Sequence, residues 1–182
     1  MIRLLLADDH GVFRQGLVQL IADHPDLSVV AEAANYVEVI DAVRTQGIDV
    51  AVLDLSMPGR GGIELIGHVK SLQPAIRILV VTMHDEEPYV AQALRAGAEG
   101  YVTKENAADT LYLAIRRLHA GGRYLCAAVV EQLAMSMAMN DFGEHRRSRG
   151  HGSCRRGRLD RAIRHTSGWL QAPALKGGQR SA

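Results

Sequence analysis

Short apolar runs alternate with helical patterns five times in the first 120 residues, and this alternation constrains the fold more than any other feature. The five runs span Ile2–Ala7, Leu27–Ala33, Val50–Leu55, Ile76–Thr82 and Gly100–Thr103, and most of them are rich in Val, Ile and Leu. Most are apolar at successive positions, which is typical of strands buried on both faces of a parallel sheet. The intervening stretches repeat apolar residues at helical spacing, as Leu17, Leu20 and Ile21 do.

This repeat of strand, helix and strand predicts a doubly wound α/β fold with right-handed crossovers. We expect a five-stranded parallel sheet in the flavodoxin-like order 2-1-3-4-5. In that order the second strand lies at the far edge. This placement explains why the second run, unlike the others, is followed by no polar candidate for a site.

Polar side chains stand at the carboxyl ends of the other four runs. They are Asp8 and Asp9 after the first run, Asp54 at the third, Thr82 at the fourth and Lys104 after the fifth. Ligands of open α/β sheets bind outside the carboxyl ends of the strands. We therefore expect these five side chains to converge on one crevice.

The chemistry of such a crevice follows from its three carboxylates. Packed together, they repel one another and favour a divalent cation, and hard oxygen ligands suit Mg²⁺. An Asp beside the metal is a competent nucleophile for phosphorus, and the product is an aspartyl-phosphate. The amine of Lys104 would supply positive charge, and the hydroxyl of Thr82 would donate to a phosphoryl oxygen.

Each of these residues also has an ordinary structural explanation. Asp8 and Asp9 suit the N-terminus of a helix, and Asp54 suits the turn that Pro58 introduces. Taken singly, Thr82 is an ordinary strand residue and Lys104 a solvated surface charge. The functional interpretation therefore rests on their joint occurrence, in order, at the ends of strands.

The same residues resemble the receiver domain of two-component response regulators. The matching motifs are Asp8-Asp9, residues 54–62 (Asp-Leu-Ser-Met-Pro-Gly-Arg-Gly-Gly), Thr82 and residues 100–104 (Gly-Tyr-Val-Thr-Lys). The resemblance covers roughly residues 1–120. The motif Ala-Asp-Asp-His, followed by Arg14 and Gly16, is most similar to the NarL/FixJ (LuxR-type) subfamily.

The resemblance implies that Asp54 is the phosphoacceptor and takes its phosphate from a sensor histidine kinase. It implies that Asp9 is the main ligand of a Mg²⁺ cofactor, with Asp8, Asp54 and the carbonyl group of Ser56 as further ligands. The expected function is that of a response regulator, which switches conformation on phosphorylation and regulates transcription.

Three further residues take switch roles by resemblance. Thr82 would be the switch hydroxyl, Lys104 the phosphate partner, and Tyr101 the aromatic residue that rotates as Thr82 closes on the phosphate. The family also implies a homodimer and DNA as partners. The resemblance also implies autodephosphorylation. Because that reaction does not turn over an external substrate, we do not expect the protein to be an enzyme.

The end of the chain differs chemically from the rest. Residues 1–143 carry a net charge of −7 and residues 144–182 a net charge of +8, and only 10 of the last 39 residues are apolar. We expect a receiver domain over residues 1–120, a linker helix over 121–143 and a basic, largely disordered tail over 144–182.

No helix-turn-helix pattern is recognisable in the tail. Its composition suggests either a frameshift product or a genuine basic tail that contacts nucleic-acid phosphates without reading sequence. A stand-alone receiver that relays phosphate without specific DNA binding is therefore an alternative function. A phosphatase of the haloacid-dehalogenase type is a weaker alternative, because Asp54-Leu55-Ser56 lacks the second Asp of the Asp-x-Asp motif.

Other features narrow the class of protein. No apolar run approaches the ~20 residues of a membrane span, and Asp8 interrupts the first apolar run too early for a signal peptide. The two cysteines, Cys126 and Cys154, lack the spacing of a zinc site or a disulfide framework. We expect a reduced, cytoplasmic protein with no membrane partner.

Overall fold

A computed structural model describes residues 1–58, 61–83, 87–131 and 134 of the chain. Strands and helices alternate in the order β1 (Ile2–Ala7), α1 (Gly11–Ala22), β2 (Leu27–Ala33), α2 (Tyr36–Thr45), β3 (Val50–Leu53), α3 (Gly62–Leu72), β4 (Arg77–Thr82), α4 (Glu87–Ala96), β5 (Gly100–Thr103), η1 (Lys104–Asn106), α5 (Ala107–His119) and β6 (Tyr124–Leu125). Part of the predicted linker helix and all of the basic tail lie outside the described residues.

The strands form one parallel sheet in the order β2-β1-β3-β4-β5-β6. The predicted flavodoxin-like order 2-1-3-4-5 is therefore confirmed, and a sixth short strand extends the sheet beyond β5. Every residue of β3 and β5 is buried. In β3 this burial matches a continuous apolar sequence, Val-Ala-Val-Leu.

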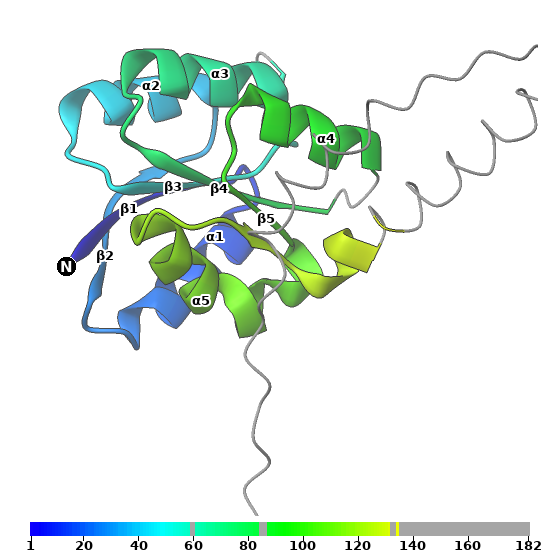
Figure 1. Cartoon of the computed structure of the whole chain (residues 1–182). Helices are drawn as coiled ribbons and strands as arrows, with labels where there is room; N and C mark the ends of the chain where they lie inside the picture. Colours follow the sequence, from blue (N-terminus) through cyan, green and yellow to red (C-terminus); the bar gives the residue numbers. More distant parts are fainter. Residues whose placement is uncertain (59–60, 84–86, 132–133, 135–182) are drawn as a thin grey trace, which may run out of the picture.

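Helices cover both faces of the sheet. Figure 1 shows α1 and α5 on one face and α2, α3 and α4 on the other. The buried side chains of the strands and helices form one apolar core between these layers. Among the helices of residues 1–58, 61–83 and 87–131, none has both the length and the hydropathy that a membrane span requires.

The sixth strand was not predicted, because its two residues are too few to carry a periodic signal. Tyr124 and Leu125 pair in parallel with Gly100 and Tyr101. Beyond the strand, the backbone N–H of Cys126 donates to the carbonyl oxygen of Tyr101 at 3.1 Å. Helical conformation begins at residue 127, so the first part of the predicted linker is joined to the sheet.

The amino edge of the sheet is held by ion pairs. Arg3, at the start of β1, lies 2.8 Å from Asp49, which directly precedes β3. Glu99 directly precedes β5 and pairs with Lys70 at 2.6 Å and with Arg77 at 3.3 Å. The candidate site residues lie at the opposite, carboxyl edge of the sheet.

Candidate functional site

Backbone hydrogen bonds place two of the predicted acids side by side. The N–H of Asp8 donates to the carbonyl oxygen of Ala33 at 3.0 Å, and the N–H of Asp54 donates to that of Ala7 at 2.8 Å. The strand ladder thus continues one residue past β1 and β3 before each chain turns away. The side chains of Asp8 and Asp54 consequently start from adjacent backbone positions at the same edge.

Lys104 completes the group from the end of β5, which lies beyond β4 at the same edge of the sheet. It directly follows β5, and its Nζ lies 2.7 Å from Oδ2 of Asp8 and 2.8 Å from Oδ2 of Asp54. The side chains of all three residues are buried, that of Asp54 completely. One ammonium group therefore bridges two carboxylates away from water.

Burial and charge act in opposite directions on Lys104. Burial lowers the pKa of its amine, since it disfavours the charged form. Hydrogen bonds and charges from Asp54 and Asp8 favour the charged form and outweigh burial, so the pKa of Lys104 is raised above its usual value. Asp8 and Asp54 therefore favour the charged form of this amine.

The acids form a cluster of the size that holds a metal ion. One ligand atom from each of Asp8, Asp9, His10 and Asp54 lies within 4.8 Å of the others. Carboxylate oxygens are the ligands that Mg²⁺ prefers. The buried Oδ2 of Asp54 contacts the Lys104 ammonium at 2.8 Å and has no further hydrogen-bond partner among the described residues. The donor set and this oxygen fit a hard divalent cation.

The loop after Asp54 is shaped by local contacts. The N–H of Ser56 donates to Oδ1 of Asp54 at 3.0 Å, which fixes the carboxylate against its own loop. Gly62 begins α3 and packs so tightly on this loop that a Cβ there would lie 2.5 Å from the carbonyl oxygen of Leu55. Only glycine fits at this close approach.

Thr82 and Tyr101 lie on neighbouring strands beside this cluster. Thr82 is the last residue of β4, is fully buried and pairs in register with Thr103, the residue before Lys104. Tyr101 is also fully buried, and its register partner is Val80. Thr82 and Tyr101 therefore lie on strands, Asp8, Asp54 and Lys104 directly follow strands, and Asp9 and Ser56 lie in the loops after β1 and β3.

Three further residues, to which the sequence alone assigns no role, border the site: His10, Arg14 and Phe13. Nδ1 of His10 lies 2.9 Å from Oδ1 of Asp9, and its backbone N–H donates to Oδ1 of Asp8 at 2.8 Å. Arg14 donates from Nη1 to the carbonyl oxygen of Asp8 and pairs with Glu32 at 3.0 Å.

Phe13 is the third neighbour, and its ring centroid lies 4.7 Å from Nζ of Lys104. The position of Phe13 in the sequence is the signal that identifies it as a neighbour of the site. Phe13 belongs to the first turn of α1, which starts directly after the acids. Side chains of a first helical turn point back towards the N-terminal end of the helix, and here that end carries the site.

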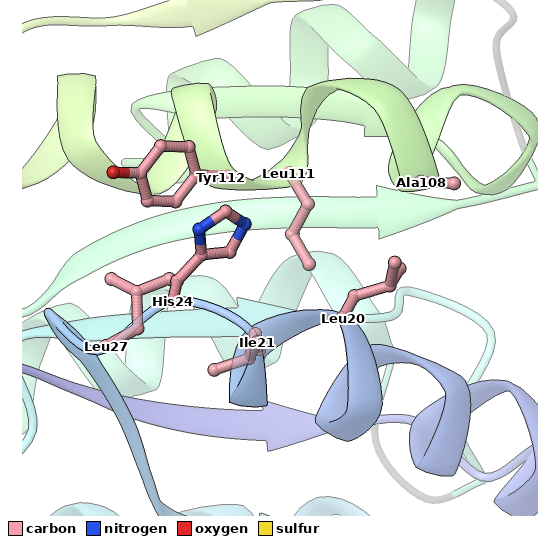
Figure 2. Close-up of a pocket in the computed structure, with 7 residues that line it drawn as sticks. All are labelled: Leu20, Ile21, His24, Leu27, Ala108, Leu111 and Tyr112. Carbon is pink, nitrogen blue, oxygen red and sulfur yellow. The ribbon is translucent and has the colours of Figure 1, made fainter.

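A separate small hollow lies between α1 and α5 (Figure 2). It is lined mainly by apolar side chains of both helices, and the ring of His24 stacks on that of Tyr112 with centroids 3.8 Å apart. None of the lining residues belongs to the acidic cluster. This hollow is therefore separate from the candidate site.

Comparisons with known proteins agree with this arrangement. Residues 4–116 match the response regulator receiver domain family. Response regulator UvrY from Escherichia coli (strain K12) is 35% identical over 136 residues. That match covers 75% of this chain and 62% of UvrY, so the chain spans less than two thirds of this relative.

Solved structures show the same similarity. A crystal structure of a two-component response regulator of the LuxR family from Aurantimonas sp. SI85-9A1 has a TM-score of 0.72 and 38% identity, covering 75% of this chain and 97% of that one. The isolated receiver domain of RcsB from Salmonella enterica serovar Typhimurium, with the phosphomimetic BeF₃⁻, has a TM-score of 0.68 and 28% identity, covering 72% and 97%.

A further RcsB structure, titled as two dimers bound to two parallel DNAs, has a TM-score of 0.69 and 28% identity and covers 73% of this chain and 68% of that one. The family match covers more than half of the chain, and relatives and solved structures of the NarL/FixJ type agree with it. The chain belongs to the response regulator receiver domain family of two-component systems.

Proposed function

We propose that Asp54 is the phosphoacceptor of this receiver and takes a phosphoryl group from a phosphohistidine of a sensor histidine kinase. The observation that carries the proposal is the position of Oδ2 of Asp54. This buried oxygen lies 2.8 Å from the Lys104 amine, beside two further acids, and has no other hydrogen-bond partner among the described residues. It is thus a buried carboxylate oxygen with positive charge directly beside it.

Asp8, Asp9, Asp54 and the carbonyl group of Ser56 would hold Mg²⁺ in this site. Bound there, Mg²⁺ supplies charge neutralisation for the carboxylates and the phosphoryl oxygens. The side chain of Asp9 is about one-third exposed, whereas those of Asp8 and Asp54 are buried. This gradient supports Asp9 as the ligand that faces the solvent side of the site.

The transfer step uses Asp54 as nucleophile. A carboxylate oxygen of Asp54 forms a bond to phosphorus as the phosphorus–nitrogen bond of the phosphohistidine breaks, and the imidazole nitrogen keeps the electron pair and is protonated. Lys104 then pairs with a phosphoryl oxygen, and the hydroxyl of Thr82 donates to another. Positioning and charge supply most of the catalysis in such transfers.

The proposed switch uses Thr82 and Tyr101, whose roles are those that the resemblance to receiver domains implies. As Thr82 approaches the phosphoryl group, Tyr101 changes its side-chain position and the surface around α4 and β5 repacks. The phosphoryl group biases an equilibrium between two conformations of the domain.

Acetyl phosphate and Mg²⁺ test the phosphoacceptor directly. We expect intact-mass spectrometry to detect one added phosphoryl group on the full chain, and the Asp54→Asn variant to remain unmodified. Asp41→Asn, on the exposed side of α2, is the matched control and is expected to be modified normally. Equal modification of Asp54→Asn, or no modification of the unaltered chain, would overturn the proposal.

The function proposed for the phosphorylated chain is regulation of transcription in the cytoplasm, as a homodimer on DNA. The similarity to LuxR-type regulators supports it, and one solved relative is titled as dimers bound to DNA. In this proposal, residues 1–120 act as the receiver, 121–143 as the linker and 144–182 as the basic tail. The protein is regulatory and has no external substrate to turn over.

A second candidate function is a stand-alone relay of phosphate, because residues 144–182 contain no recognisable helix-turn-helix pattern. Light scattering with and without beryllofluoride tests for the homodimer, and a gel shift of the full chain on promoter DNA tests for specific binding. Sequence-dependent retardation supports the transcriptional role. Sequence-independent or absent retardation, together with phosphate transfer to a phosphotransfer histidine protein, supports the relay.

A further inference from the structure

The amine of Lys104 has three close neighbours. Two are the carboxylates of Asp8 and Asp54, at 2.7 and 2.8 Å, and the third is the ring of Phe13, whose centroid lies 4.7 Å from Nζ. The side chain of Lys104 is only 8% exposed, so little water reaches the amine. The two carboxylates engage two sides of the ammonium group, and the aromatic ring borders a third.

The position of Phe13 follows from the start of α1. The helix begins at Gly11, directly after the loop of Asp8, Asp9 and His10, and Phe13 lies in its first turn. Its side chain is half-buried and packs against the core. The ring is therefore held by the fold and does not depend on Lys104 for its place.

We propose that Phe13 is a positioning residue for Lys104, whose ammonium it holds between the two carboxylates and keeps in contact when the ammonium turns to a phosphoryl oxygen on Asp54. The negative face of an aromatic ring attracts a cation within about 6 Å of its centroid, and the attraction strengthens where water is excluded. The inference rests on the proposed phosphoacceptor role of Asp54.

The nature of the contact suits a lysine that must move. A third carboxylate would hold the ammonium by directed hydrogen bonds and oppose its departure. The face of a ring attracts the charge without a fixed direction, so Nζ can shift across it at little cost. An aliphatic side chain of similar volume would fill the space but would offer no charge attraction to the desolvated amine.

Substitution of Phe13 distinguishes charge attraction by the ring from simple filling of space. Beryllofluoride in the presence of Mg²⁺ serves as the phosphoryl mimic, and isothermal titration calorimetry of the full chain measures its binding. We expect Phe13→Leu to weaken beryllofluoride binding by up to about thirtyfold, because the ring stabilises the ammonium more when it faces the phosphoryl mimic than when two carboxylates already hold it; thirtyfold is the upper limit for the loss of one such cation–π contact. Unchanged affinity in Phe13→Leu would overturn the inference.

A fluorine series provides a readout that packing alone does not move. The chain has two phenylalanines, Phe13 and Phe142, so a Phe142→Leu background leaves Phe13 as the single site for fluorinated phenylalanine. One, two and three ring fluorines change the volume little but withdraw charge from the ring face stepwise. The series also serves if Phe13→Leu fails to fold.

We expect beryllofluoride affinity to fall with each added fluorine, while the thermal unfolding midpoint stays near that of the background chain. Equal affinity across the series would overturn the role of Phe13 and leave Asp54 as phosphoacceptor untouched. Failure of the unfluorinated background chain and of the unaltered chain to bind beryllofluoride would instead overturn the proposed function, and this inference with it.

Discussion

Lys104 Nζ lies 2.8 Å from Oδ2 of Asp54, although the two residues are fifty positions apart in the sequence. The same ammonium lies 2.7 Å from Asp8, so a single positive charge serves two buried carboxylates. Removing one partner of a buried ion pair is more damaging than the net stabilisation of the pair suggests, because the remaining charge is left without compensation.

The Lys104→Met variant should therefore lose stability. We expect a decrease of about 3–5 kcal/mol in the free energy of unfolding, since both Asp8 and Asp54 would lose their counter-charge. Chemical denaturation at neutral pH measures this loss. Adding Mg²⁺ should recover part of the stability, because a cation on the same carboxylates replaces the missing charge. A loss that Mg²⁺ leaves unchanged would contradict the electrostatic explanation.

Asp9 should matter for metal affinity more than for folding, because its side chain is about one-third exposed. We expect Asp9→Asn to weaken Mg²⁺ binding by at least about tenfold, since the affinity of such sites depends on the number of charged ligands. Calorimetric titration with Mg²⁺ gives the affinity. Asp23→Asn, on the exposed turn after α1, is the matched control and should bind Mg²⁺ as the unaltered chain does.

Two adjacent glycines provide a test of the loop after Asp54. A Cβ on Gly62 would lie 2.5 Å from the carbonyl oxygen and 2.6 Å from the Cα of Leu55, whereas a Cβ on Gly61 would meet nothing within 4 Å. We expect Gly62→Ala to cost about 1–3 kcal/mol of stability, as overpacking does, because backbone must move. Gly61→Ala should change the unfolding midpoint little, and equal effects of the two variants would argue against the close contact.

The pair of Arg3 and Asp49 predicts a pH dependence of stability. The hydrogen bond from the Arg3 side chain is the largest of the effects that lower the pKa of Asp49 from 3.8 to about 2. A lowered folded-state pKa means that the carboxylate stabilises the fold above pH 3.8 and loses this effect as pH falls towards 2.

Asp49→Asn should therefore be less stable than the unaltered chain at neutral pH. The difference in unfolding free energy should stay constant down to about pH 5 and then narrow as the medium becomes more acidic. Urea denaturation of both proteins at a series of pH values measures it. A difference that widens on acidification would show that the sign is wrong.

The site was predictable from the sequence because the parallel sheet brings strand ends to one edge. Asp8, Asp54 and Lys104 each directly follow a strand, and the register of three neighbouring strand pairs then determines which of them meet. The contacts of Phe13 and Arg14 were not predictable in this way. They depend on the rotation of α1 about its axis, which apolar periodicity alone does not fix to the level of single atoms.

The short strand β6, beyond β5, could not be predicted from the sequence either. A two-residue strand has no measurable alternation, and the apolar residues that follow Tyr124 suit a helix equally well. The backbone bond from Cys126 to Tyr101 joins this segment to β5, and such long-range pairing leaves no local pattern in the sequence.

The ion pairs of Arg3 with Asp49 and of Lys70 with Glu99 lie at the amino edge, across the full length of the strands from the acidic cluster. Ion pairs thus stabilise both edges of one sheet, but only those of Lys104 include the acids of the candidate site. Substitutions at Arg3 or Lys70 can therefore change the free energy of unfolding while the charges around Asp54 stay the same.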